Sequence, residues 1–157
     1  MAFKTLTEII HNTNHELLTY NDIKKYIKLF SEKDQKILRT YMYYRVLYNS
    51  VTWEYTDENV HFDYEIGGLT DSSNKWIFYC DDVSTQHDVY YSDIDMYYWE
   101  IVLLHEMAHA AVGAKEGHNQ IWKDKCSEIA KNKFPDNNDK YNKLFNIFMY
   151  QIGKSTK

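Results

Sequence analysis

The stretch IVLLHEMAHAAV, Ile101–Val112, is apolar at every position except His105, Glu106 and His109. A helix that is apolar nearly all round is a buried helix. Burying two imidazoles and a carboxylate costs on the order of several kcal/mol unless each group finds a partner. The stretch therefore predicts a buried helix that needs partners for three polar side chains.

The segments on either side of this helix differ from one another in the period at which apolar residues recur. Before it, short segments rich in aromatic and β-branched residues alternate partly and are separated by turn-prone residues, including Gly67-Gly68. They predict an antiparallel sheet of three to four strands within residues 51–92, built from VTWEYT, VHFDYEI, KWIFYC and HDVYYS. Asp93 or Asp95 is the N-cap candidate of the buried helix, and Gly113 is its C-cap candidate.

Helical periods also appear at both ends of the chain. After Gly113, the segments 118–134 and 139–152 read as helices, and together with the buried helix they make a helical part over 95–152. The N-terminal part, 1–50, reads as helical throughout, with three helices: Thr5 to Leu18, one capped by Asn21 and running to Phe30, and one capped by Ser31 and running to Asn49-Ser50. Helices, a small sheet and then helices define an α+β fold, and 157 residues suit a single domain over 1–157.

The composition points to an intracellular protein. Apolar residues make up 44% and charged residues 26% of the chain. Only Cys80 and Cys126 are present, outside any CxxC pair, so neither a disulfide framework nor a cysteine zinc site is expected. No apolar run reaches the length of a signal peptide or of a membrane span of roughly 18 residues. We therefore expect a cytoplasmic protein, in the host cytoplasm if its origin is viral, with no membrane partner.

The net charge of −5 is unevenly distributed. Residues 51–100 carry twelve acidic side chains against the single Lys75, whereas residues 1–50 and 115–157 are net positive. An acidic middle segment repels phosphate backbones and suits a basic protein or peptide partner, although a solvated acidic surface explains it equally well. The lysines from Lys115 onward could touch nucleic acid, but solvation of helices is their simplest explanation. Charge therefore does not support nucleic acid as a partner.

His105 and His109 have the spacing of two ligands to one metal ion. Four residues apart on an α-helix, their imidazoles lie on one face, one turn apart, and can reach one zinc ion. Glu106 lies about 100° around the helix, where it can act as general base on a zinc-bound water. An HExxH motif arises by chance with a probability of roughly 2% at this composition, so the motif alone is only suggestive. Its position on a buried helix strengthens the prediction of a metal site. The competing explanation is a pair of satisfied core histidines.

A catalytic zinc site usually takes three protein ligands, so a third must come from elsewhere. His118 is the best candidate, because Gly113 ends the helix and Gly117 gives the backbone freedom to aim His118 back toward it. Glu128 on the following helix is the second candidate, and Glu116 is the third.

The segment HEMAHAAVGAKEGHNQIW, His105–Trp122, resembles the SprT-like zinc metallopeptidases, in the short form without a zinc ribbon found in phages and other viruses. In that family a Gly-His step opens the helix after HExxH, with an aromatic residue four positions after the third His, as in Gly117, His118 and Trp122 here. The resemblance covers about residues 99–129. It implies a zincin-like metallopeptidase core, with His105, His109 and His118 as zinc ligands and Glu106 as the catalytic acid/base.

The expected function is therefore zinc-dependent hydrolysis of peptide bonds in a protein or peptide substrate. His87, Tyr90 and Tyr91, on the last predicted strand, are candidates to stabilise the oxyanion. The main alternative is a zinc-stabilised binding or interference protein without turnover, against which the intact Glu106 argues. A module without metal that binds a basic partner is the remaining one.

Overall fold

The structure, a computed structural model, describes residues 15–46, 60–63, 67–80 and 89–155. The fold is α+β, as the sequence predicts. Its elements in chain order are β1 (His15–Leu18), α2 (Tyr20–Ile27), α3 (Glu32–Leu38), β2 (Met42–Val46), β3 (Val60–Asp63), β4 (Gly68–Asp71), β5 (Trp76–Cys80), β6 (Tyr90–Tyr91), β7 (Met96–Tyr97), α4 (Tyr98–Val112), the 3-10 turn η2 (Ala114–Glu116), α5 (Gln120–Lys133) and α6 (Asn138–Ser155).

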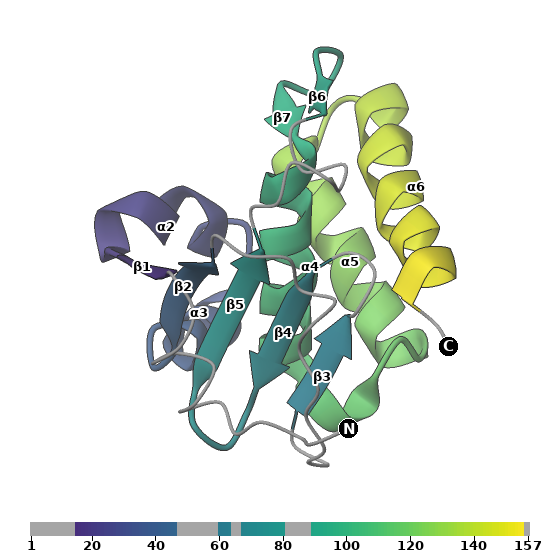
Figure 1. The fold of residues 1–157 in the computed structure, drawn as a ribbon. Coiled ribbons are helices and arrows are strands. Elements are labelled where there is room, and N and C mark those ends of the chain that lie inside the picture. Colours follow the sequence, from purple (N-terminus) through teal and green to yellow (C-terminus); the bar gives the residue numbers. More distant parts are fainter. Residues whose placement is uncertain (1–14, 47–59, 64–66, 81–88, 156–157) are drawn as a thin grey trace.

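The main sheet has five strands in the order β1-β2-β5-β4-β3 (Figure 1). It is mixed rather than antiparallel, because β2 runs parallel to β5 while the other neighbours are antiparallel. The strands β6 and β7 form a separate hairpin, so Tyr90 and Tyr91 of the predicted strand HDVYYS lie outside the main sheet. The predicted strand VTWEYT lies outside the described residues.

Two segments that the sequence predicts as helical are strands. The helix that begins at its predicted cap Ser31 ends at Leu38, and residues 42–46 continue as β2. These residues are Met, Tyr, Tyr, Arg and Val, most of which suit a strand, and pairing with Trp76–Cys80 decides their state. His15–Leu18, the end of the first predicted helix, pairs with β2 as β1. The prediction was wrong at both segments because their hydrogen-bond partners are distant in sequence.

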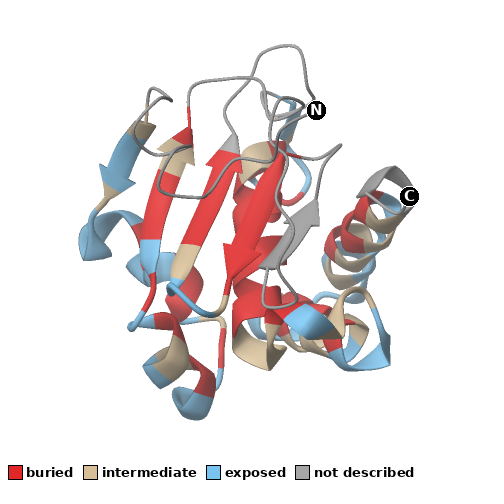
Figure 2. Ribbon diagram, turned by 60° about the horizontal axis from the view of Figure 1, so that its bottom comes forward, coloured by how far each residue is buried: buried red, intermediate tan, exposed pale blue. Residues whose placement is uncertain are grey.

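Helix α4 lies between the sheet and α5 (Figure 1). It packs against β4 and β5 on one side and against α5 and α3 on others, and α6 packs mainly on α5. Buried residues gather in the central strands and along α4 (Figure 2). The prediction of a buried helix is confirmed, because every residue from Ile101 to Ala110 is buried, and Ala111 and Val112 at its end are partly exposed. No helix in the described part of the chain is both long and apolar enough to cross a membrane.

The start of α4 differs from the prediction. The N-cap is Tyr97 rather than Asp93 or Asp95, because Met96 and Tyr97 pair with Tyr90 and Tyr91 before the helix begins. The Glu100 carboxylate accepts a hydrogen bond of 2.8 Å from the Tyr97 backbone N–H and one of 2.6 Å from the Tyr26 hydroxyl. Glu100 thus caps α4 and joins it to α2. The predicted C-cap at Gly113 is confirmed.

We predict that Tyr26→Phe lowers the free energy of unfolding by about 1–3 kcal/mol, because it removes a buried donor to the Glu100 carboxylate. Burial raises the pKa of the Tyr26 hydroxyl and the bond to Glu100 raises it further, so the hydroxyl stays protonated and donating. The measurement is urea denaturation. Tyr20→Phe, the same change at an exposed position of the same helix, should stay within about 0.5 kcal/mol of the unsubstituted protein. Equal losses from both variants would contradict this account of Glu100.

Candidate metal centre

Three polar side chains lie on Ile101–Ala110, the continuously buried stretch of α4. His105, Glu106 and His109 are all fully buried, with no exposed surface. The four-residue spacing brings the rings of His105 and His109 to one face, with their centroids 5.0 Å apart. The helix thus supplies two imidazoles to one point and turns the carboxylate of Glu106 toward the sheet, where Thr70 contacts it.

A tight turn after α4 returns the chain to this face. Gly113 has a φ of 103° and Gly117 a φ of 59°, both in the region that favours glycine. Between them η2 forms, and the Ala114 N–H donates a 3.1 Å hydrogen bond to the Ser72 hydroxyl in the β4–β5 turn. The N-cap Asn119, whose side chain accepts from the Trp122 N–H, then starts α5. The two glycines, together with the hydrogen bonds of Ala114 to Ser72 and of Trp122 to Asn119, therefore set the position of His118.

The three histidines form a nearly regular triangle. The ring centroid of His118 lies 5.0 Å from that of His105 and 5.0 Å from that of His109. The Nε2 atoms of His105 and His118 are 3.0 Å apart, and one ring nitrogen from each of the three residues lies within 4.8 Å of the others. Zinc–nitrogen bonds of about 2.0–2.1 Å at tetrahedral angles separate ligand nitrogens by about 3.4 Å, which falls in this range. Three imidazoles are also a common catalytic donor set for zinc, so the residues fit that ion.

Neither alternative third ligand joins the triangle. The Glu128 carboxylate accepts a hydrogen bond of 2.7 Å from Lys125, which also binds Asp34 on α3. The Glu116 carboxylate accepts one of 2.6 Å from the Asn119 side chain. Among the described residues, the group able to hold a metal consists of the three histidines. The structure thus brings together His105, His109 and His118, and it places Glu128 in an ion-pair cluster.

Trp122 packs against all three rings of the triangle. Its ring centroid lies 4.6 Å from that of His105, 5.2 Å from that of His109 and 4.7 Å from that of His118. The indole is fully buried, and its N–H donates a 3.3 Å hydrogen bond to the His105 carbonyl. Trp122 thus forms an apolar wall against the histidines. His118 is the one member of the triangle that keeps partial exposure.

The carboxylate of Glu106 lies against β4. The Thr70 hydroxyl is 2.7 Å from Glu106 Oε1 and 2.9 Å from the Glu106 carbonyl oxygen. A Cβ atom on Gly68 would lie only 2.3 Å from Glu106 Oε2, so the strand offers this carboxylate space only because that residue is glycine. Sequence reasoning missed both residues and assigned Gly67-Gly68 to a turn. A glycine inside a strand often marks such a close approach, which is the signal that could have found it.

A further polar residue missed by sequence reasoning contacts the triangle from α6. Gln151 is fully buried, and its Oε1 lies 2.8 Å from His105 Nδ1. Neither spacing nor a recognisable motif connects the two residues, which are 46 positions apart.

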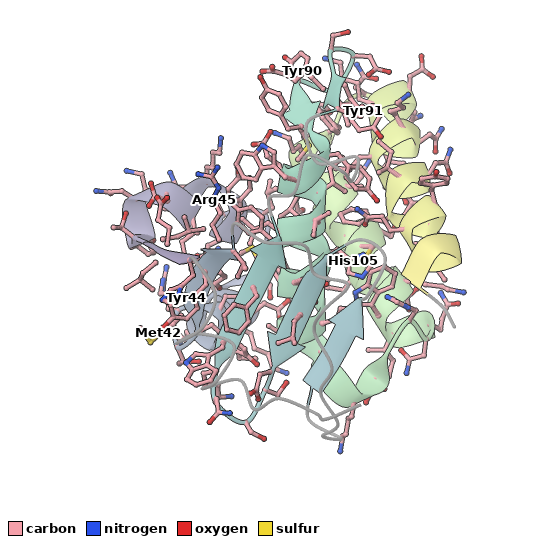
Figure 3. The ribbon with its side chains drawn as sticks, viewed as in Figure 1. Met42, Tyr44, Arg45, Tyr90, Tyr91 and His105 are labelled. Carbon is pink, nitrogen blue, oxygen red and sulfur yellow. The ribbon has the colours of Figure 1, made fainter. Side chains whose placement is uncertain are left out.

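The oxyanion candidates Tyr90 and Tyr91 do not lie at the triangle. Both belong to the β6–β7 hairpin, which Figure 3 shows well away from His105. The Tyr90 hydroxyl donates to Asp95, and the Tyr91 ring contacts the Lys143 ammonium. The third candidate, His87, lies outside the described residues.

We predict that Gly68→Ala lowers the free energy of unfolding by about 1–3 kcal/mol, because the new methyl group overlaps the buried Glu106 carboxylate. The measurement is chemical denaturation within a double-mutant cycle. In a Glu106→Ala background the same methyl group meets no carboxylate, so Gly68→Ala should then cost little or stabilise slightly. The same loss in both backgrounds would show that Gly68 does not serve to accommodate Glu106.

Comparison of the chain with known proteins finds no matching family model, no similar curated protein and no similar solved structure. The function of this centre is therefore inferred from its own residues and geometry.

Proposed function

We propose that the protein is a zinc metallopeptidase of the SprT-like type with a zincin-like core. In this proposal His105, His109 and His118 hold the zinc ion, and Glu106 is the general acid/base. The observation that carries the proposal is a triangle of three imidazoles, two of them fully buried, with a fully buried carboxylate next to His105 on the same helix. A purely structural site has no need for that carboxylate, whereas hydrolysis does.

A bound zinc ion would supply Lewis acidity toward water and toward a peptide carbonyl. Glu106 would accept a proton from the attacking water and return it to the leaving amine nitrogen. The Thr70 hydroxyl, 2.7 Å from one carboxylate oxygen, fixes the orientation in which Glu106 does so. Trp122 excludes water from one side of the histidines, which strengthens electrostatic interactions within the centre.

The proposed substrate is an extended segment of a protein or peptide. Substrate would approach from the side of His118, the histidine that retains exposure. In the described part of the sheet the outer strands are β1 and β3, and β3 is the one in contact with η2, which leads to His118. A peptide pairing along β3 would gain regular backbone hydrogen bonds close to the centre. The excess of acidic residues over 51–100 favours a basic substrate.

We place this activity in the cytoplasm, and in that of a host if the chain is viral. Cys126 is buried as a thiol within the apolar core, which suits a reducing compartment.

We predict that the protein, purified without a histidine tag, binds about one zinc per chain and cleaves unfolded protein substrates or itself. Glu106→Gln should retain zinc but lower the cleavage rate by about 10²–10⁴-fold, because the general base is lost. Metal analysis and gel-based cleavage assays measure the two effects. Zinc bound at full occupancy without cleavage by the unsubstituted protein would favour the alternative, a zinc-stabilised binding or interference protein. Absence of zinc after reconstitution would overturn both functions.

We also predict that His118→Ala weakens zinc binding by more than the roughly 10–100-fold typical of changes outside the ligand set, because it removes a direct ligand. The matched control is Glu128→Gln, which alters the carboxylate bound to Lys125 and should leave zinc affinity unchanged. Competition with a chromophoric chelator gives both affinities. The reverse ranking of the two variants would make Glu128 the third ligand.

A further inference from the structure

The buried face of α6 carries one polar residue where its pattern calls for an apolar one. Leu144, Ile147 and Phe148 recur at helical spacing on this face, and Gln151 continues the series. Gln151 is fully buried. A buried amide weakens the core relative to a leucine or methionine unless its hydrogen bonds are made. Its presence at this position therefore calls for a specific partner.

That partner is His105, the first histidine of the triangle. Gln151 Oε1 lies 2.8 Å from His105 Nδ1. A carbonyl oxygen can only accept, so His105 Nδ1 must carry the hydrogen. In the neutral ring this leaves the lone pair on Nε2, and Nε2 is the atom that faces His118 Nε2 at 3.0 Å. The contact with Gln151 thus selects the tautomer whose free lone pair points into the triangle.

We propose that Gln151 is a positioning residue for the metal centre, which holds His105 in the Nδ1–H tautomer with Nε2 directed at the point shared by the three histidines. Its effect on zinc affinity rests on the proposed metal site, whereas its effect on the tautomer does not. Hydrogen bonds of this kind fix the ring orientation of a ligand and raise its basicity. Helix α6 thus takes part in the metal centre, because its Gln151 supplies the hydrogen-bond acceptor for His105 Nδ1.

The test compares two substitutions at one position. Gln151→Leu removes the acceptor at similar size, whereas Gln151→Glu keeps an oxygen where Oε1 stands. Leu144→Ala, a change on the same buried face two turns away, controls for general loosening of α6. Two quantities are measured on the full chain: zinc affinity by chelator competition, and the His105 tautomer in the metal-free protein by NMR of ¹⁵N-labelled histidine. Thermal unfolding identifies any variant that fails to fold.

The expected result is that Gln151→Leu weakens zinc binding by about 10–100-fold and removes the preference for Nδ1–H at His105. Gln151→Glu should keep both the tautomer and an affinity within a few-fold of the unsubstituted protein. Leu144→Ala should lower thermal stability without changing either quantity.

Two outcomes would overturn the proposal. One is a Gln151→Leu variant with unchanged tautomer and unchanged zinc affinity. The other is an unsubstituted protein whose His105 carries its hydrogen on Nε2, since the glutamine amide would then be the donor to Nδ1 rather than the acceptor. If the unsubstituted protein bound no zinc, the proposed function would fail, while the tautomer measurement would still decide the role of Gln151.

Discussion

The arrangement of this protein depends on the burial of three polar side chains on α4. Because the middle of the helix is buried, His105, Glu106 and His109 have no bulk water to satisfy their hydrogen bonds. The hydrogen-bonding groups around them come from other elements: β4 supplies Thr70, and α6 supplies Gln151. The sheet and the C-terminal helix are thus tied to α4 by polar contacts as well as by apolar packing.

The parts that could be predicted from the sequence are those whose determinants are local. The spacing of His105 and His109, the cap at Ser31 and the glycine that ends α4 each act within a few residues, and each holds in the structure. The return of His118 could be anticipated for the same reason. Two glycines within five residues allow a turn that few other residues permit, and both have positive φ.

The parts that could not be predicted depend on partners distant in sequence. The aromatic residues around β2 recur at helical spacing, but they also suit a strand, and the parallel pairing with β5 settles the matter. The strand β4 is short and begins at Gly68. In the sequence alone, this glycine is indistinguishable from an ordinary turn residue. Position 68 requires glycine because the Glu106 carboxylate lies against it, and this contact exists only when α4 packs on β4. The same holds for Gln151, whose partner is on another helix.

The proposed general base Glu106 and the histidine His105 are adjacent in sequence, but the elements that contact them lie on opposite sides of α4 along the chain. Thr70 on β4 contacts the Glu106 carboxylate, and Gln151 on α6 contacts the His105 ring. The strand β4 precedes α4 in the chain, and α6 follows it. A change in β4 can therefore move the Glu106 carboxylate while leaving the His105 imidazole in place, and a change in α6 can do the reverse. Between them, Trp122 touches all three rings, so α5 couples the histidines to one another. Under the proposed function, metal affinity and proton transfer would for this reason depend on separate parts of the fold, although His105 and Glu106 share one turn of helix.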